Sequence, residues 1–191
     1  AGLERLAMIL QEKKSIFETD LFVPLMIPLE SNQVLNEKSA RIVTDHIRTA
    51  VFMINDGVLP SNTDRGYILR RLLRRAYLHA RKMKAEDSIL NIIDLIIGHR
   101  SYKNLYSFDS GLTKNVYSEE INKFKTTLED GLKQFEKGID PFILFTSYGF
   151  PLELTKELAH ENNLPLDFAN LAKTEEGQAK FKKFLTEKLI L

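Results

Sequence analysis

The chain has 191 residues, 43% of them hydrophobic and 28% charged, and its 27 Lys and Arg residues nearly balance 26 Asp and Glu residues. This composition is typical of a globular protein of one or two domains with a substantial core. The absence of cysteine excludes disulfides and thiolate metal sites and is typical of a reducing compartment, so we expect a cytoplasmic protein.

Residues 1–11 predict the first helix, because apolar residues recur along one of its faces. These residues are Leu3, Leu6, Ala7 and Leu10. Gly2 leads into the helix, so backbone N–H groups at its start could face an anion.

Two further helices are predicted in the first third of the chain. In residues 15–30 the pair Thr19–Asp20 is a candidate N-cap, and Pro28 is expected to end or kink the helix. Residues 36–56 give the clearest helical pattern, with an inward face followed by a second half that is apolar all round. Gly57 is expected to end this helix as a C-terminal glycine.

Residues 58–64 (VLPSNTD) predict a tight loop before the next helix. Ser61, Asn62, Thr63 and Asp64 are all of the types that N-cap positions prefer, so one of them should cap that helix. From the residues alone, capping is the simpler interpretation of Asn62.

Residues 65–84 (RGYILRRLLRRAYLHARKMK) hold eight basic residues and no acidic one, so the positive charge of this neutral chain is local. On a helix the basic side chains form two neighbouring ridges about 100° apart, opposite an apolar face. The ridges are Arg70, Arg74 and Arg81, and Arg71, Arg75 and Lys82. The planar guanidinium suits phosphates, which favours docking to a phosphate backbone. The alternative is a face that is solvated or paired with carboxylates from elsewhere in the chain.

The remaining pattern is also helical. Residues 86–97 predict a buried helix, because their apolar run is too short to cross a bilayer and is interrupted by Asp94. Residues 99–111 predict a loop whose aromatic residues either stack on bases or, more commonly, pack beneath the loop. Residues 112–138 predict a long, charged helix. The four histidines lack metal-ligand spacing, so no metal site is expected.

Residues 45–76 (DHIRTAVFMINDGVLPSNTDRGYILRRLLRRA) closely resemble the core segment of alanyl-tRNA synthetases. In that family a helix ends in a DGV-L-P-SN turn and R-G-Y-x-L-R-R-x-x-R-R follows. Residues 2–5 (GLER) resemble the end of motif 3 of class II synthetases, and residues 148–151 (YGFP) resemble the family's YGFP turn. The three segments follow the family's order, and the resemblance covers nearly the whole chain, most weakly over residues 101–137.

The resemblance implies an all-α fold in two parts. Residues 1–30 would be the end of the class II catalytic domain, and residues 31–191 a helical domain that recognises the tRNA acceptor stem. Because the chain begins inside a recognisable motif, we expect a fragment of a longer enzyme that attaches alanine to tRNA using ATP and Mg²⁺. The fragment alone is expected to be inactive and to hold no cofactor.

The resemblance also implies individual site residues. Arg5 corresponds to the motif 3 arginine that packs over the adenine of ATP and reaches its terminal phosphate, and we group Gly2 and Glu4 with it. Without the family, an ion pair would be the simpler interpretation of Arg5. Asn62 matches the asparagine that contacts the G·U wobble pair of the acceptor stem. The arginines expected to contact tRNA are Arg65, Arg70, Arg71, Arg74 and Arg75.

The chain departs from the family before the YGFP turn. The family's L-Y-D-T-Y-G-F-P is here LFTSYGFP, so the aspartate that acts with the asparagine on the wobble pair is replaced by Thr146. A hydroxyl accepts a hydrogen bond more weakly than a carboxylate. Either Thr146 or Ser147 therefore makes a lesser contact, or recognition depends more on Asn62.

The implied partners are alanine-accepting tRNA, and ATP and alanine through a catalytic domain outside this chain, with no membrane. Two alternatives belong to other classes. One is a regulatory module that reads DNA with the arginine helix in a major groove. The other is a helical interaction domain whose arginines pair with an acidic protein partner.

Overall fold

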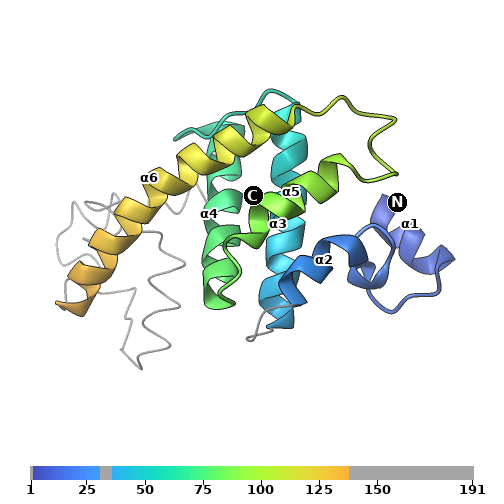
Figure 1. Ribbon diagram of the computed structural model, residues 1–191, viewed down its shortest axis with the longest axis horizontal. Helices are drawn as coiled ribbons and strands as arrows, with labels where there is room; N and C mark the ends of the chain where they lie inside the picture. The colour runs from blue at the N-terminus through green and yellow to red at the C-terminus, as the bar shows by residue number, and fades with distance from the viewer. Residues whose placement is uncertain (1, 31–35, 138–191) are drawn as a thin grey trace, which may run out of the picture. The chain divides into compact units, whose positions relative to one another are not determined.

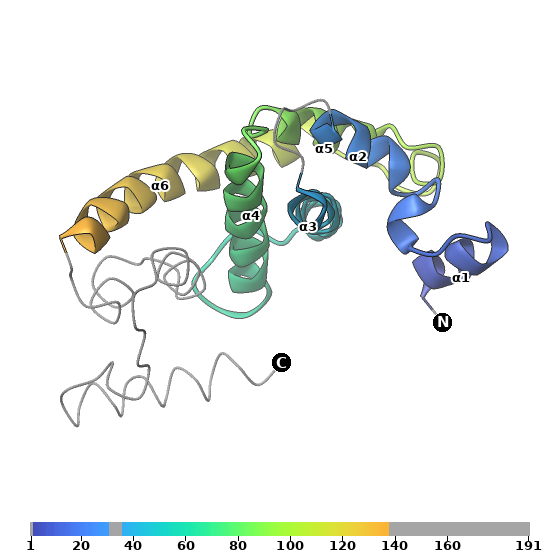
Figure 2. The same cartoon turned by 90° about the horizontal axis from the view of Figure 1, so that it is seen from below.

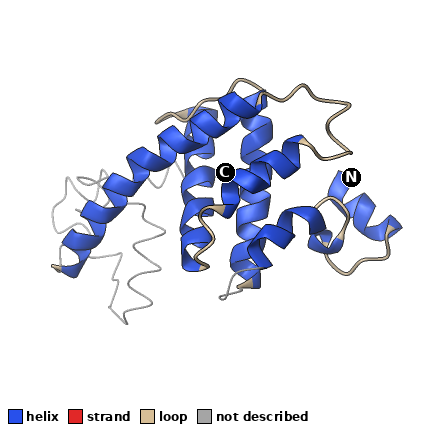
Figure 3. Cartoon of the chain, viewed as in Figure 1, coloured by secondary structure: helices blue, strands red, loops and turns tan. Residues whose placement is uncertain are grey.

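The computed structural model describes residues 2–30 and 36–137, which are helices joined by loops (Figures 1 and 3). No strand occurs among these residues, so the all-α prediction is confirmed for them. The elements are α1 (Leu3–Leu10), the 3-10 helix η1 (Ile16–Glu18), α2 (Val23–Glu30), α3 (Glu37–Asn55), α4 (Asp64–Lys82), α5 (Ser88–Ile97) and α6 (Ser110–Glu136). The predictions for Thr146 and for residues 148–151 lie outside the described residues.

The chain divides into two compact units, residues 1–122 and 123–191. The first unit contains α1 to α5 and the first half of α6. Its central element is α3, which contacts α2, α4 and α5. Figure 2 views α3 nearly end on, with α4 beside it and α2 and α5 above it. Every residue of the candidate site described below belongs to this first unit.

Helix α3 is central because its apolar residues are covered by three neighbours. The residues that the pattern places inward are all at most 2% exposed: Val43, Ile47, Ala50, Val51 and Ile54. Asn36 caps the helix by accepting a hydrogen bond from the backbone N–H of Ser39 at 2.9 Å. Gly57 follows the helix with a φ of +79°, which confirms it as a C-terminal glycine.

Helices α4 and α5 pack on α3 through their apolar faces. The buried apolar residues of α4 and its C-terminus include Leu69, Leu73, Ala76, Ala80 and Met83, all predicted to face the core. A buried polar contact also joins α4 to α3, where His79 Nδ1 lies 3.0 Å from Ser39 Oγ. The four fully buried isoleucines of α5 confirm that residues 86–97 contain a buried helix: Ile89, Ile92, Ile93 and Ile96.

The segment before α2 differs from its prediction. Ser15 caps the short η1, and α2 begins only at Val23. Thr19 does not cap α2 through its hydroxyl, which donates back to the carbonyl of Ile16 at 2.6 Å. Local side chain–backbone hydrogen bonding therefore replaces a longer helix in this segment.

Helix α2 continues through Pro28 instead of ending there. Proline removes one backbone N–H near the end of this short helix. Three side chains of the same segment are fully buried: Phe22, Leu25 and Leu29. Burial of this kind overrides an unfavourable local preference, because the cost of proline is offset by packing.

The apolar face predicted for α1 forms, but no residue of α1 is buried by the described part of the chain. The exposed fractions of its large apolar residues are 57% for Leu3, 50% for Leu6, 67% for Ile9 and 74% for Leu10. The periodicity of this segment therefore predicts its helix but not its burial.

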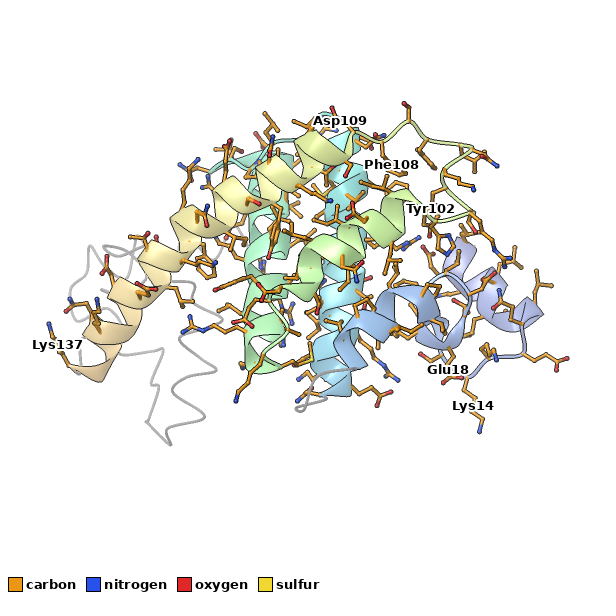
Figure 4. The ribbon with its side chains drawn as sticks, viewed as in Figure 1. Lys14, Glu18, Tyr102, Phe108, Asp109 and Lys137 are labelled. Carbon is orange, nitrogen blue, oxygen red and sulfur yellow. The ribbon has the colours of Figure 1, made fainter. Side chains whose placement is uncertain are left out.

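The loop between α5 and α6 carries aromatic residues that pack on Phe52 of α3. The ring centroids of Tyr102, Tyr106 and Phe108 lie 5.1, 5.1 and 5.3 Å from that of Phe52, nearly perpendicular to it. Figure 4 labels Tyr102 and Phe108, which both belong to this loop. These contacts support the packing interpretation of the aromatic residues. Asp109 then caps α6 by accepting from the N–H of Leu112 at 2.8 Å.

Candidate nucleic-acid interface

The loop between α3 and α4 brings Asn62 to the surface, where its side chain is exposed. Thr63, not Asn62, is the N-cap residue of α4, and its side chain makes no capping hydrogen bond. Ser61 Oγ folds the turn by donating to the carbonyl of Thr63 at 2.8 Å. The carbonyl oxygen of Asn62 accepts a hydrogen bond from Nη1 of Arg70. The asparagine is therefore joined to α4 through an arginine side chain.

Gly66 allows the loop to lie directly against α4. A Cβ at this position would come within 2.8 Å of Ser61 Cβ and closer still to the carbonyl oxygen of Leu59. Asp64, the first residue of α4, has a φ of +49°, a conformation that aspartate tolerates better than most residues. Only a glycine at position 66 permits this approach. Gly66 belongs to the R-G-Y motif, but the motif alone does not indicate this role.

The two arginine ridges of α4 have different surroundings. Arg70 and Arg74 are half-buried and lie beside Glu120 of α6, which is only 3% exposed. Arg74 donates from Nε to Glu120 Oε1 at 2.7 Å, and its Nη2 lies 2.7 Å from the same oxygen. Arg70 Nε lies 3.3 Å from that oxygen. For Arg70 and Arg74 of this ridge, the alternative of pairing with a carboxylate from elsewhere in the chain is therefore observed.

The second ridge faces solvent. Arg71 and Arg75 are exposed, as is Arg65 near the start of the helix. With a rise of about 1.5 Å per residue, Arg65 and Arg75 lie about 15 Å apart along the helix axis. Neither of these two makes an ion pair with any described residue. The surface defined by Arg65, Arg71 and Arg75, called here the outer ridge, is exposed along the helix and can contact several anionic groups of one extended ligand.

The N-terminal candidates divide in the same way. Gly2 is the N-cap of α1, and Arg5 is exposed without an ion pair among the described residues. Glu4 faces α3, where its Oε1 lies 2.7 Å from Nη2 of Arg48. A hydrogen bond from its own backbone and one from Arg48 lower the pKa of Glu4 below its ordinary value of 4.5. Arg5 is thus the side chain of this segment that is open to a ligand.

Arg48 joins α1 to α3 through its ion pair with Glu4. Its Nε donates to the hydroxyl of Tyr102 at 2.9 Å, and its guanidinium lies over the rings of Phe22, Phe52 and Tyr102. Burial alone would lower the pKa of Arg48, but hydrogen bonds to Glu4 and Tyr102 raise it above the usual value. Asp45, three residues before Arg48 on α3, instead lies 3.1 Å from Nδ1 of His46.

Comparison with known proteins places this geometry in a family. Residues 1–189 match the family model described as tRNA synthetases class II (A). The chain belongs to this family. Among curated relatives, it is 36% identical to an alanine–tRNA ligase of Mesomycoplasma hyopneumoniae (strain 232) over 210 residues, which covers 96% of this chain and 23% of the relative.

Two further alanine–tRNA ligases show the same degree of similarity to this class II (A) chain. The identity is 36% with that of Blochmanniella floridana, covering 94% of this chain and 22% of the relative. It is 37% with that of Picosynechococcus sp. (strain ATCC 27264 / PCC 7002 / PR-6), covering 95% and 22%. This member of the class II (A) family therefore spans less than a quarter of the length of these curated relatives.

The described residues of this class II (A) chain contain neither a membrane-spanning helix nor a cluster of metal ligands. None of the helices in residues 2–30 and 36–137 has the length and apolar character needed to cross a bilayer. The same residues contain no group of three or more His, Cys, Asp or Glu side chains arranged to hold a metal ion.

Proposed function

We propose that this chain is part of an alanine–tRNA ligase of the cytoplasm, in which it docks the acceptor stem of tRNA and contacts the G·U wobble pair. Membership of the class II (A) family and the names of the relatives support the activity of the parent enzyme. The observation that carries the docking role is the exposed Asn62, which accepts a hydrogen bond from Arg70 of α4, the helix that also carries the outer ridge.

The chemistry of an amide suits the proposed reading of the wobble pair. The wobble guanine leaves its 2-amino group unpaired in the minor groove, which is the wide and accessible groove of A-form RNA. A carbonyl oxygen can accept two hydrogen bonds. Asn62 can therefore accept from the guanine amine while it accepts from Arg70. Thr146 remains the proposed second contact with the wobble pair. Because its hydroxyl is a weaker acceptor than a carboxylate, discrimination between base pairs depends more on Asn62.

The phosphate contacts follow from exposure. Arg65, Arg71 and Arg75 of the outer ridge are exposed, so we assign to them the contacts with the backbone phosphates nearest α4. Arg70 and Arg74 share Glu120 and lie at the edge of this surface. They contribute their remaining N–H donors to the same RNA backbone. Their contribution to the electrostatic attraction is smaller, because the carboxylate of Glu120 already pairs with both.

Within the parent enzyme, the proposal places ATP beside the start of α1. Arg5 is exposed and would lie over the adenine and reach the terminal phosphate, with backbone N–H groups after Gly2 nearby. Glu4 orients this helix through Arg48. ATP supplies the energy for activating alanine, and Mg²⁺ would accompany its phosphates. The alanine pocket and most nucleotide contacts belong to parts of the enzyme outside this chain.

The docking proposal is tested by measuring binding of the chain to two acceptor-stem minihelices that differ only in G·U against G·C at the wobble position. Fluorescence anisotropy across a salt series gives affinity and the salt slope together. We expect tighter binding of the G·U minihelix, a steep slope, and loss of the preference in Asn62→Ala with folding intact. Equal binding of both minihelices would overturn the readout by Asn62, and equally tight binding of duplex DNA would favour the alternative DNA-binding module.

A further inference from the structure

Glu120 is a buried carboxylate that the wobble-pair proposal does not use. It lies on α6, in the part of the sequence where resemblance to the family is weakest, and it is only 3% exposed. A carboxylate is costly to bury unless cationic partners surround it. Arg74 and Arg70 provide these partners from α4, 46 residues or more away along the chain.

The two arginines do not depend on Glu120 equally. Arg74 makes a hydrogen bond of 2.7 Å to Oε1 of Glu120. Arg70 Nε lies 3.3 Å from the same oxygen, and it is buried without a hydrogen-bond partner. Arg70 is thus held beside Glu120 by charge more than by hydrogen-bond geometry. Without the carboxylate, Arg70 and Arg74, one helical turn apart, would repel each other.

Arg70, positioned by Glu120, in turn positions the side chain of Asn62. Its Nη1 donates to the carbonyl oxygen of the Asn62 amide. A guanidinium has donors only, so the atom of the amide that faces it must be the oxygen and not the nitrogen. The position of Arg70 therefore fixes which way the amide of Asn62 is turned.

We propose that Glu120 is a positioning residue for wobble-pair recognition, which acts through Arg70 to fix the orientation of the Asn62 amide. The inference rests on the proposed function of Asn62 and adds to it a specificity determinant on a different helix. Glu120 is buried on α6, whereas Asn62 lies on the exposed loop before α4. Its effect should therefore appear in discrimination between base pairs and not in overall affinity.

The test compares wild type, Glu120→Gln, Arg70→Gln and the double variant on the G·U and G·C minihelices. Glu120→Gln keeps the shape of the side chain but removes its charge. We expect the G·U preference to fall by about tenfold, the scale of one well-placed base contact. Binding of the G·C minihelix should be unchanged or tighter, because a negative charge beside the arginines is lost. General damage to the fold would instead weaken binding of both minihelices.

Arg70→Gln breaks the same connection at its other end and leaves the pair between Arg74 and Glu120 to support the fold. It should lose the same preference, and the double variant should lose no more than either single variant, because both act through one contact. The matched control is Asp94→Asn, which breaks another ion pair of α6, with Lys114 at 2.7 Å. It should keep the preference of the wild type.

The possible results distinguish the positioning role of Glu120 from the reading of the wobble pair by Asn62, on which that role depends. If wild type prefers G·U but Glu120→Gln or Arg70→Gln retains that preference, the positioning role is overturned while the function of Asn62 stands. Losses that add in the double variant would also overturn it, since Glu120 would then act by another route. If wild type shows no preference, the reading of the pair by Asn62 is overturned and the inference falls with it.

Discussion

Gly66 determines how closely the loop carrying Asn62 can approach α4. The loop backbone at Leu59 and the side chain of Ser61 occupy the space that a Cβ at position 66 would need. Backbone atoms move less readily than the end of a flexible side chain, so a substitution at Gly66 must displace the loop. A displaced loop would carry Asn62 away from Arg70.

Gly66→Ala is therefore expected to destabilise the fold by about 1–3 kcal/mol, the usual cost of inserting a methyl group into a filled space. It should also remove the preference for the G·U minihelix. Urea denaturation and minihelix binding measure the two effects. The matched control is Gly111→Ala in the first turn of α6, where the nearest atom to a Cβ is Asp109 Oδ1 at 3.3 Å. A Gly66→Ala variant as stable and selective as the wild type would contradict the close approach.

Arg48 combines an ion pair, a hydrogen bond and contacts with aromatic rings. It pairs with Glu4, donates to Tyr102 and lies over three aromatic rings. Arg48→Met keeps much of the aliphatic volume but loses the charged hydrogen bonds, so we expect a loss of about 1.5–3 kcal/mol in the free energy of unfolding. Arg100→Gln is the control, because the pair of Arg100 with Asp20 is exposed and should be worth about 0.2–1 kcal/mol. Similar losses in both variants would contradict the anchoring role of Arg48.

The structural role of a single residue could be predicted from the sequence where it depends only on the neighbouring backbone. Gly57 follows from the rule for helix C-termini, and its positive φ confirms it. Gly66 was not recognised, because its role depends on a loop folding back from residues 59–61. The pairing of Arg48 with Glu4 is likewise not visible in the sequence, because the two residues are 44 positions apart along the chain. Local rules describe neighbours in sequence, whereas these contacts are set by tertiary packing.

At the scale of elements, apolar periodicity predicted the helices well and their surroundings less well. The inward faces of α3 and α4 are buried as expected, because other helices of the same unit cover them. The equivalent face of α1 is exposed, because the element that α1 mainly contacts is the short η1. The two ridges of α4 were also predictable from spacing, but only the position of α6 decides that Arg70 and Arg74 lie beside Glu120.

The ion pair between α1 and α3 gives this connection a dependence on pH. The pKa of Glu4 in the folded state is below its ordinary value of 4.5, so the folded protein binds this proton less readily than the unfolded chain. The stabilisation from Glu4 is therefore complete above about pH 4.5 and is lost as the pH falls through the lower, folded-state pKa. Raising the pH above neutrality should not change it.

Glu4→Gln should consequently lower the free energy of unfolding at neutral pH and converge with the wild type in acid. Urea denaturation of both proteins, at neutral pH and in steps below pH 4.5, measures the difference between them. Asp20, whose pKa is also lowered by hydrogen bonds from Gln11 and Arg100, titrates equally in both proteins and cancels. A difference that stays constant into acid would show that Glu4 acts by packing and not by charge.

For the whole molecule, net charge is a poor guide to nucleic-acid binding. The chain carries a formal charge of only +1, yet eight basic residues without an acidic one fall in residues 65–84. Salt-dependent binding reports the phosphates that are neutralised locally, so a neutral protein with such a helix can still show a steep salt slope. The structure adds that Glu120 partners two of these arginines, so the exposed Arg65 and Arg75 are expected to carry most of this effect.

The two ridges should therefore respond differently to the same substitution. Arg75→Gln removes an exposed guanidinium and should lower the salt slope of minihelix binding by about one, with little change in stability. Arg74→Gln removes the closest partner of a buried carboxylate, so it should mainly lower the free energy of unfolding, by about 3–5 kcal/mol. Its effect on the salt slope should be smaller, because the group lost was already paired. Equal changes of slope with equal stability in the two variants would mean that the pairing with Glu120 does not persist when RNA binds, and that both ridges meet phosphate.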